Sequence, residues 1–192
     1  MKMDRNWTVL FIGGASGIGK SRVAYELSNI YGANVIEADD VCQAIKAMTI
    51  KEYFPAIHYW ETGVNWKDIG IESNVDWLIS VSKEIVPALK AIAENHLESN
   101  MPIIIEGDFV DPEFAMSFNS PKVQSLVILE SDQNQIVQNL LSREGGDLQQ
   151  FRADISVRYG ERLSSMCEKL GIPVIESKPW ETVIDRIIAN VT

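Results

Sequence analysis

Five short apolar runs recur along the chain, each bounded by polar or turn-forming residues. They cover residues 8–12, 34–38, 102–106, 125–130 and 172–176. Each run is too short for a helix and lacks polar alternation, which is typical of strands that are buried on both faces. The pattern therefore predicts a parallel sheet covered by helices on both sides.

Between these strands, apolar residues recur with the spacing of amphipathic helices. The predicted helices span residues 20–31, 40–48, 71–98, 133–141, 148–170 and 181–189. The third is the longest, and we expect its apolar stripe to cover the sheet. Strands that alternate with helices over 192 residues, of which 46% are hydrophobic, predict one α/β domain across residues 1–192.

Composition limits the possible partners and compartments. The formal net charge is -10 and the pI is about 4.7, so the overall field repels nucleic acids and anionic membranes. No apolar run approaches the roughly 20 residues of a membrane span, and no signal-peptide pattern follows the first residues. Cys42 and Cys167 lie far apart, which fits free thiols in a reducing compartment. We therefore expect a cytoplasmic protein; a monomer and a homodimer both stay open.

The segment after the first strand, GASGIGKS at residues 14–21, matches the P-loop pattern G-x-x-x-x-G-K-[ST]. A flexible glycine turn is the plainer alternative, but the preceding strand and following helix favour a nucleotide site. Lys20 is expected to reach the β- and γ-phosphates of ATP, and the Ser21 hydroxyl to bind Mg²⁺. The predicted phosphate cradle consists of Gly14, Ala15, Ser16, Gly17, Ile18, Gly19, Lys20 and Ser21.

Carboxylates follow two of the predicted strands, at the edge where α/β proteins collect ligands. After the second strand, Asp39 is a candidate to orient or deprotonate a phosphoryl acceptor. Asp40 is a candidate Mg²⁺ ligand, or alternatively the N-cap of the next helix. After the third strand, Glu106 is expected to act on Mg²⁺ through water and Asp108 to face the substrate; an ordinary solvated junction is the alternative.

Residues 51–70 are rich in aromatic side chains and poor in helical periodicity. This segment predicts an acceptor-binding insert, in which His58, Tyr59, Trp60 and Trp66 line a pocket for a small molecule. The alternative is a small core of buried aromatic side chains beneath a long loop.

Several stretches together resemble the 2-phosphoglycerate kinase-like group of P-loop kinases, and more distantly chloramphenicol phosphotransferase and adenylate kinases. They read GGASGIGKS, EADDVCQAI, IHYWET, IIIEGDFVDP and GIPVIESKPWETVIDRI. The resemblance implies a five-stranded parallel sheet of order 2-3-1-4-5, with ATP and Mg²⁺ as co-substrates and a small-molecule acceptor. It aligns Asp39 with the acceptor-side aspartate. Where the group's pattern has arginine, this chain has Cys42, which weakens the case for an anionic acceptor.

The resemblance also implies an arginine-bearing lid, expected at residues 142–152. Arg143 is the first candidate to clamp the transferring phosphoryl group and Arg152 the second, with Gly145 and Gly146 as hinge residues. Two further arginines, Arg158 and Arg162, stand one helical turn apart and are typical of surface ion pairs.

After the fifth strand, Pro179 and Trp180 occupy the region where adenylate-kinase-like proteins contact adenine. The alternative is the start of a helix with Trp180 packed on the core.

The leading hypothesis is thus an ATP-dependent small-molecule kinase, because GTPase base-recognition motifs are absent from the sequence and the chain is short for an AAA-type ATPase. A nucleotide-binding regulatory protein without metabolite kinase activity is the alternative. A kinase acting on nucleic-acid ends is disfavoured by the net charge.

Overall fold

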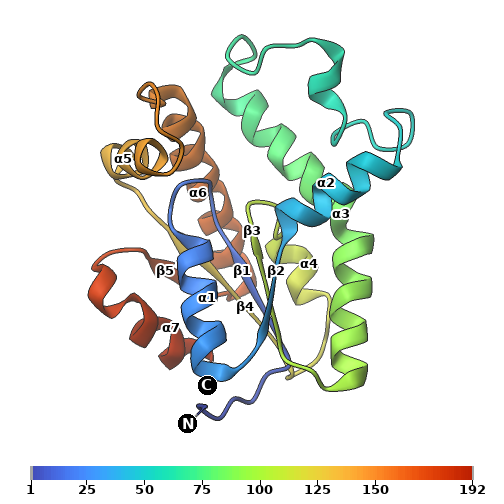
Figure 1. The fold of residues 1–192 in the computed structure, drawn as a ribbon, viewed down its shortest axis with the longest axis vertical. Coiled ribbons are helices and arrows are strands. Elements are labelled where there is room, and N and C mark those ends of the chain that lie inside the picture. Colours follow the sequence, from blue (N-terminus) through green and yellow to red (C-terminus); the bar gives the residue numbers. More distant parts are fainter. Residues whose placement is uncertain (1, 192) are drawn as a thin grey trace.

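The five predicted strands form one sheet in a computed structural model that describes residues 2–191. The strands are β1 (Val9–Gly13), β2 (Asn34–Glu37), β3 (Ile103–Gly107), β4 (Val123–Leu129) and β5 (Val174–Glu176). All neighbouring strands pair in parallel, in the order β2-β3-β1-β4-β5 (Figure 1). The predicted α/β class and the strand order implied by the resemblance are confirmed.

Within the described residues, seven α-helices flank the sheet or extend beyond it. They are α1 (Lys20–Tyr31), α2 (Ala38–Met48), α3 (Gly70–Ser99), α4 (Pro112–Met116), α5 (Gln133–Glu144), α6 (Gln150–Leu170) and α7 (Val183–Val191). Two single-turn 3₁₀ helices, η1 (Tyr59–Thr62) and η2 (Trp180–Thr182), lie in the connections. Six of the helices match predicted ones, and the sequence analysis missed α4.

Helix α4 has only five residues, too few to show a helical apolar period. Its start nevertheless carries a local signal. The side chain of Asp111 caps the helix by accepting a hydrogen bond from the Glu113 amide at 2.7 Å, and Pro112 occupies the first helical position.

The central strand β1 is buried on both faces because its neighbours and the helices leave it no contact with solvent. Leu10 and Ile12 belong to a cluster that includes buried residues of α1 and α7, whereas Val9 and Phe11 belong to one that includes residues of α3 and α4. This alternation is what a strand's two-residue period requires. Packing from both sides fixes β1, and with it the loop that leaves its carboxyl end.

The loop after β1 lies at the carboxyl edge of the sheet, between two groups of elements. Helix α5 and the first turns of α6 lie on one side, and the upper part of α3 with the insert at residues 51–70 lies on the other (Figure 1). Helix α3 is long enough, at 30 residues, to pack on the sheet at one end and carry the insert at the other.

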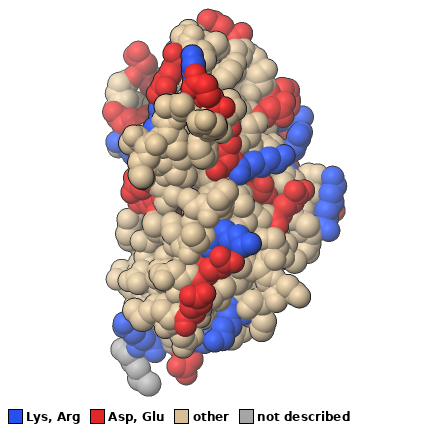
Figure 2. Space-filling view, turned by 90° about the vertical axis from the view of Figure 1, so that its right-hand side faces the viewer, with Lys and Arg blue, Asp and Glu red and all other residues tan. Residues whose placement is uncertain are grey.

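On the face shown in Figure 2, acidic side chains gather over the end of the molecule that carries the insert, and basic side chains lie singly or beside acids. Within residues 2–191, every helix is too short or too polar to cross a membrane.

Candidate active site

The P-loop runs from the end of β1 into the first turn of α1. Lys20 begins α1, and its side chain is only 7% exposed. Its Nζ donates hydrogen bonds to the Ala15 carbonyl at 2.8 Å and to Asp108 Oδ1 at 2.6 Å. The ammonium group is therefore held inside the loop, near the amides at the helix N-terminus that favour anions.

Glu106 lies beside this loop because β3 pairs directly with β1, with Ile12 opposite Glu106. The carboxyl group is buried and hydrogen-bonded to the Ser21 side chain. Burial raises the pKa of Glu106, and the charge of Lys20 and the bond to Ser21 oppose that rise. A hydroxyl and a carboxylate are oxygen ligands of the kind that Mg²⁺ prefers.

These two groups would not hold a metal ion by themselves. Among the described residues there is no cluster of three or more His, Cys, Asp and Glu side chains arranged for metal binding. Mg²⁺ is commonly held by one or two protein oxygens together with substrate phosphates, and the Ser21–Glu106 pair fits that mode.

Asp39 and Asp108 come from different strand ends and meet at the same edge. Asp39, in the first turn of α2, accepts a hydrogen bond from the Asp108 backbone amide. Burial, with the Asp108 charge, raises the pKa of Asp39 to about 6. Gly107 permits the approach: it has φ +153°, and a Cβ there would lie 2.8 Å from the Ala38 Cβ and 2.9 Å from Asp39 Oδ2.

The neighbouring Asp40 behaves differently. It is exposed and lines neither of the two cavities described below, so its role at Mg²⁺ stays a prediction. The capping alternative for Asp40 is wrong, because α2 begins two residues earlier, at Ala38, with Glu37 at the N-cap position.

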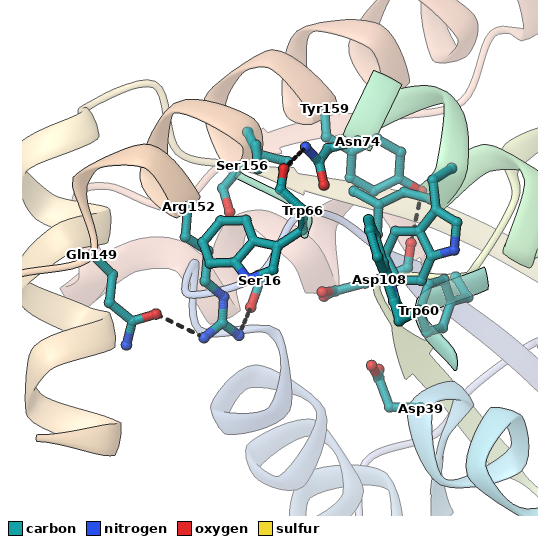
Figure 3. A pocket seen from close by; sticks show the side chains of 14 residues that line it. Ser16, Asp39, Trp60, Trp66, Asn74, Asp108, Gln149, Arg152, Ser156 and Tyr159 are labelled. Carbon is teal, nitrogen blue, oxygen red and sulfur yellow. Dashed lines mark hydrogen bonds between the residues drawn. The ribbon is translucent and has the colours of Figure 1, made fainter. Parts of the chain in front are cut away.

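A cavity of about 400 Å³ opens next to the two aspartates (Figure 3). Asp39, Asp108 and Ser16 line it, together with the predicted insert residues Trp60 and Trp66. The structure therefore brings the acceptor-side aspartates, the P-loop and part of the insert to one place.

The sequence analysis missed several residues of this cavity, among them Trp77 and Asn74 of α3 and Tyr159 of α6. The Tyr159 hydroxyl donates to the Asp108 carbonyl at 2.7 Å, and Asn74 Nδ2 donates to the Trp66 carbonyl at 2.8 Å. Both contacts hold segments of the site in position. Residues on the apolar stripes of long helices give no sequence signal that separates a cavity wall from a core.

His58 and Tyr59 do not line the cavity, contrary to expectation. His58 is buried within the insert, where Nδ1 lies 2.8 Å from Glu61 Oε2 and Nε2 lies 3.1 Å from Thr49 Oγ1. The Tyr59 ring packs edge-on against Trp60 at 4.8 Å. For these two residues, the alternative of a small core beneath the insert describes the structure.

Two of the predicted lid arginines reach the P-loop. Arg152 donates to Ser16 Oγ at 3.1 Å and lines the cavity, and Arg143 lies 3.5 Å from the same oxygen. Both also bind Glu144, at 2.8 Å and 2.5 Å, and hydrogen bonds from Gln149 and Arg143 lower the pKa of Glu144 to about 2.

The remaining two arginines form exposed ion pairs, as expected. Arg158 contacts Glu72 and Glu161 at 2.5 and 2.9 Å, and Arg162 lies 3.7 Å from Asp76.

A second cavity, of about 300 Å³, lies along the P-loop and is lined by Lys20, Ser21, Arg143 and Trp180. Trp180 packs so closely over Gly19 that a side chain there would overlap its ring. Asn139, which the sequence analysis also missed, donates from Nδ2 to the Gly17 carbonyl at 2.8 Å.

Pro179 does not line this second cavity; its carbonyl accepts a hydrogen bond from Arg186 at 3.1 Å.

Curated relatives that match nearly the whole chain are named 2-phosphoglycerate kinase. The protein of Methanothermobacter thermautotrophicus is 27% identical over 200 residues, which cover 96% of this chain and 65% of that protein. The protein of Methanococcus vannielii is 29% identical over 217 residues, which cover 99% of this chain and 66% of that protein. The chain thus spans just under two thirds of the length of these relatives. No family model matches the sequence.

Solved structures with a similar fold include small-molecule kinases. The gluconokinase from Sinorhizobium meliloti 1021 has a TM-score of 0.55 at 14% identity, covering 98% of this chain and 93% of its own. A sugar kinase from Janibacter sp. HTCC2649 has a TM-score of 0.56 at 17% identity, covering 96% and 94%. The resemblance of this chain to the P-loop small-molecule kinases is therefore confirmed, in its fold by these structures and in its sequence by the curated relatives.

Proposed function

We propose that the protein transfers the γ-phosphoryl group of ATP to a hydroxyl of a small molecule. One observation carries this proposal: P-loop residues line two cavities, and the buried Lys20, in the wall of the second, is paired with Asp108 in the wall of the first. A kinase needs a place for the donor and a place for the acceptor on either side of the transferred group. A nucleotide switch has no need of the acceptor-sized cavity.

The second cavity suits the nucleotide. The P-loop amides and Lys20 would bind its phosphates, and Trp180, stacked with Arg22 at 5.6 Å from the ring centre, offers a flat surface to the base. Ser21 and Glu106 would hold Mg²⁺. When bound there, Mg²⁺ neutralises charge that develops on the phosphate oxygens.

The first cavity suits the acceptor, with Asp39 as the group that accepts its proton. During transfer, the acceptor oxygen forms a bond to the γ-phosphorus and the bond from that phosphorus to the bridging β,γ-oxygen breaks. The hydroxyl proton passes to the Asp39 carboxylate, and ADP leaves with the bridging oxygen. A carboxyl with a pKa of about 6 is ionised at neutral pH and still basic enough for this role.

Arg152 and Arg143 would stabilise the negative charge on the transferred group, since both reach Ser16 of the P-loop. The glycines at 145 and 146 separate the two arginines and both have positive φ, which fits a lid across residues 142–152. The names of the curated relatives support the same reaction class.

The experiment is to measure MgATP binding by calorimetry and ADP formation with a panel of small alcohols, in the wild type and in Lys20→Met. Lys20→Met keeps the aliphatic stem but removes the charge, so we expect MgATP affinity to fall by at least tenfold and turnover by at least a hundredfold. Lys90→Met is the matched control, because Lys90 is an exposed lysine of α3 that pairs with Glu94 and lines neither cavity.

The thermal midpoint of each variant checks that the fold is retained. Wild-type affinity and turnover in a folded Lys20→Met protein would show that the P-loop is not the nucleotide site.

A further inference from the structure

We propose that the acceptor is an uncharged hydroxyl compound with a flat apolar face, rather than a phosphorylated or multiply charged acid. This inference rests on the proposed kinase function and concerns the first cavity alone. It starts from the walls of that cavity, which are aromatic on the side of the insert and α3.

Trp60 and Trp77 pack edge to face at 4.9 Å, and Phe109 meets Trp77 at 6.2 Å. Leu78 and Ile155 add aliphatic surface. Figure 3 shows the Trp60 ring beside Asp108, so an apolar group of the acceptor can rest on the indole while its hydroxyl lies near the aspartates. Aromatic and aliphatic walls bind apolar faces, but they offer no cationic partner to a phosphate or carboxylate group.

The charges around the cavity oppose an anionic acceptor. Among the described lining residues, Arg152 is the one cation, against the two carboxylates Asp39 and Asp108. Arg152 already bonds both oxygens of Glu144, at 3.0 and 2.8 Å. Lys20, next to the cavity, is paired with Asp108 and is needed for the nucleotide. A multiply charged acid would lose its hydration without gaining the cationic partners that such groups require.

Two groups on the wall, from Asn74 and Asp39, can accept hydrogen bonds from a ligand, and the hydroxyls of Ser16 and Ser156 can donate or accept. Asn74 uses both hydrogens of Nδ2 on the Trp66 and Gly70 carbonyls, at 2.8 and 2.7 Å, which leaves Oδ1 for a ligand. The Tyr159 hydroxyl already donates its hydrogen to the Asp108 carbonyl. Asp39 adds a carboxylate. The Asn74 and Asp39 oxygens favour a ligand group that donates hydrogen bonds, which a hydroxyl does and an ionised carboxylate or phosphate does not.

The size of the cavity agrees with this class. About 400 Å³ is within the range of pockets that enclose ring-containing small molecules. A three-carbon acid would leave the aromatic walls without a partner.

The test uses acceptors of matched skeleton. 3-Phenyl-1,2-propanediol and 3-phenyllactate differ only in a hydroxymethyl group against a carboxylate, and 2-phosphoglycerate represents the multiply charged acids. We expect the diol to bind at least tenfold more tightly than 3-phenyllactate by calorimetry, and to stimulate ADP formation more than 2-phosphoglycerate does. Tighter binding of either acid, or no binding of the diol, overturns the inference.

Two variants assign the effect to the cavity. Trp60→Ala should weaken diol binding at least fivefold and leave MgATP affinity unchanged. Tyr53→Ala, an exposed aromatic residue of the same insert, should change neither. If Trp60→Ala binds the diol like the wild type, the aromatic wall is not the binding surface.

MgATP binding to the same preparations separates the two proposals. If the wild type does not bind MgATP, the kinase function is refuted. If it binds MgATP and phosphorylates 2-phosphoglycerate, only the proposed acceptor class is refuted.

Discussion

The folded structure disfavours the ionised form of the Asp39 carboxyl group, which lowers the stability of the protein at neutral pH. Asp39 is half-buried, it lies beside Asp108, and its pKa is raised from 3.8 to about 6. A structural acid in the same position would be better placed in solvent, as its neighbour Asp40 is. Residues that oppose stability in this way are frequent in active sites, where a shifted pKa serves the reaction.

The shift predicts how Asp39→Asn changes stability with pH. The folded protein binds the Asp39 proton more tightly than the unfolded chain, so wild-type stability falls as pH rises from about 4 to 6 and stays reduced above that. Asp39→Asn should therefore be more stable than the wild type at pH 8 by up to about 3 kcal/mol, and by about half as much at pH 5.

Urea unfolding at both pH values measures the difference. Asp40→Asn, at the exposed neighbouring aspartate, is the control for the substitution itself. A pH-independent effect of Asp39→Asn would show that the pKa of Asp39 is not raised in the folded protein.

Glu144, at the end of α5, pairs with both predicted lid arginines, Arg143 of the same helix and Arg152 of α6. Its carboxylate binds Arg143 and Arg152 and stays ionised at neutral pH because its pKa lies near 2. In the proposed kinase, Glu144 therefore occupies two cations that would otherwise face the nucleotide phosphates. Glu144→Gln should raise MgATP affinity by about threefold or more, because the competing charge is removed.

Calorimetry measures MgATP affinity in Glu144→Gln and in the control Glu161→Gln. The control removes an acid that is paired with Arg158 on the outer side of α6. Equal affinity in Glu144→Gln and the wild type would mean that the two arginines do not face the nucleotide.

The turn between the P-loop and α1 gives a further prediction. Gly19 has φ +93°, and an added Cβ would overlap the ring of Trp180. Gly19→Ala should lower MgATP affinity by at least tenfold, because the loop or the indole must move.

Gly171→Ala is a matched control for backbone strain, since Gly171 also has positive φ, at +68°, but has no atom within contact distance of the new Cβ. It should lose stability and keep its MgATP affinity. If both variants bind MgATP equally, the packing of Trp180 on the P-loop is irrelevant to the site.

At the scale of elements, the sequence predicts most of the fold. Continuous apolar runs and glycine-ended helices locate all five strands and six helices, because a parallel sheet must be buried on both faces. Helix α2 begins at Ala38 directly after β2, earlier than predicted, because no turn residue separates them.

The candidate site is only partly predictable, because some of its residues have a local sequence pattern and others do not. The P-loop has its own sequence motif. The candidate carboxylates Asp39, Glu106 and Asp108 stand at or directly after the ends of predicted strands. The cavity wall depends on how α3 and α6 pack, so the roles of Trp77 and Tyr159 leave no local mark.

At the scale of the whole molecule, an acidic protein with a net charge of -10 must bind a polyanion locally. The fold provides this by placing the amides at the start of α1, Lys20 and two lid arginines around one loop. Two cavities lie beside this loop at the sheet edge, and the proposed function assigns one to the phosphoryl donor and the other to the acceptor. The proposal therefore fixes where the phosphoryl group goes after it leaves ATP.

The most direct measurement follows that group. The protein is incubated with Mg²⁺, γ-³²P-labelled ATP and an uncharged alcohol that binds the first cavity, and the products are separated by chromatography. We expect label in a phosphate monoester of the alcohol, with an equal amount of ADP, and loss of both in Asp39→Asn and Lys20→Met. Label released only as inorganic phosphate, or transfer unaffected in these variants, would contradict the proposed function.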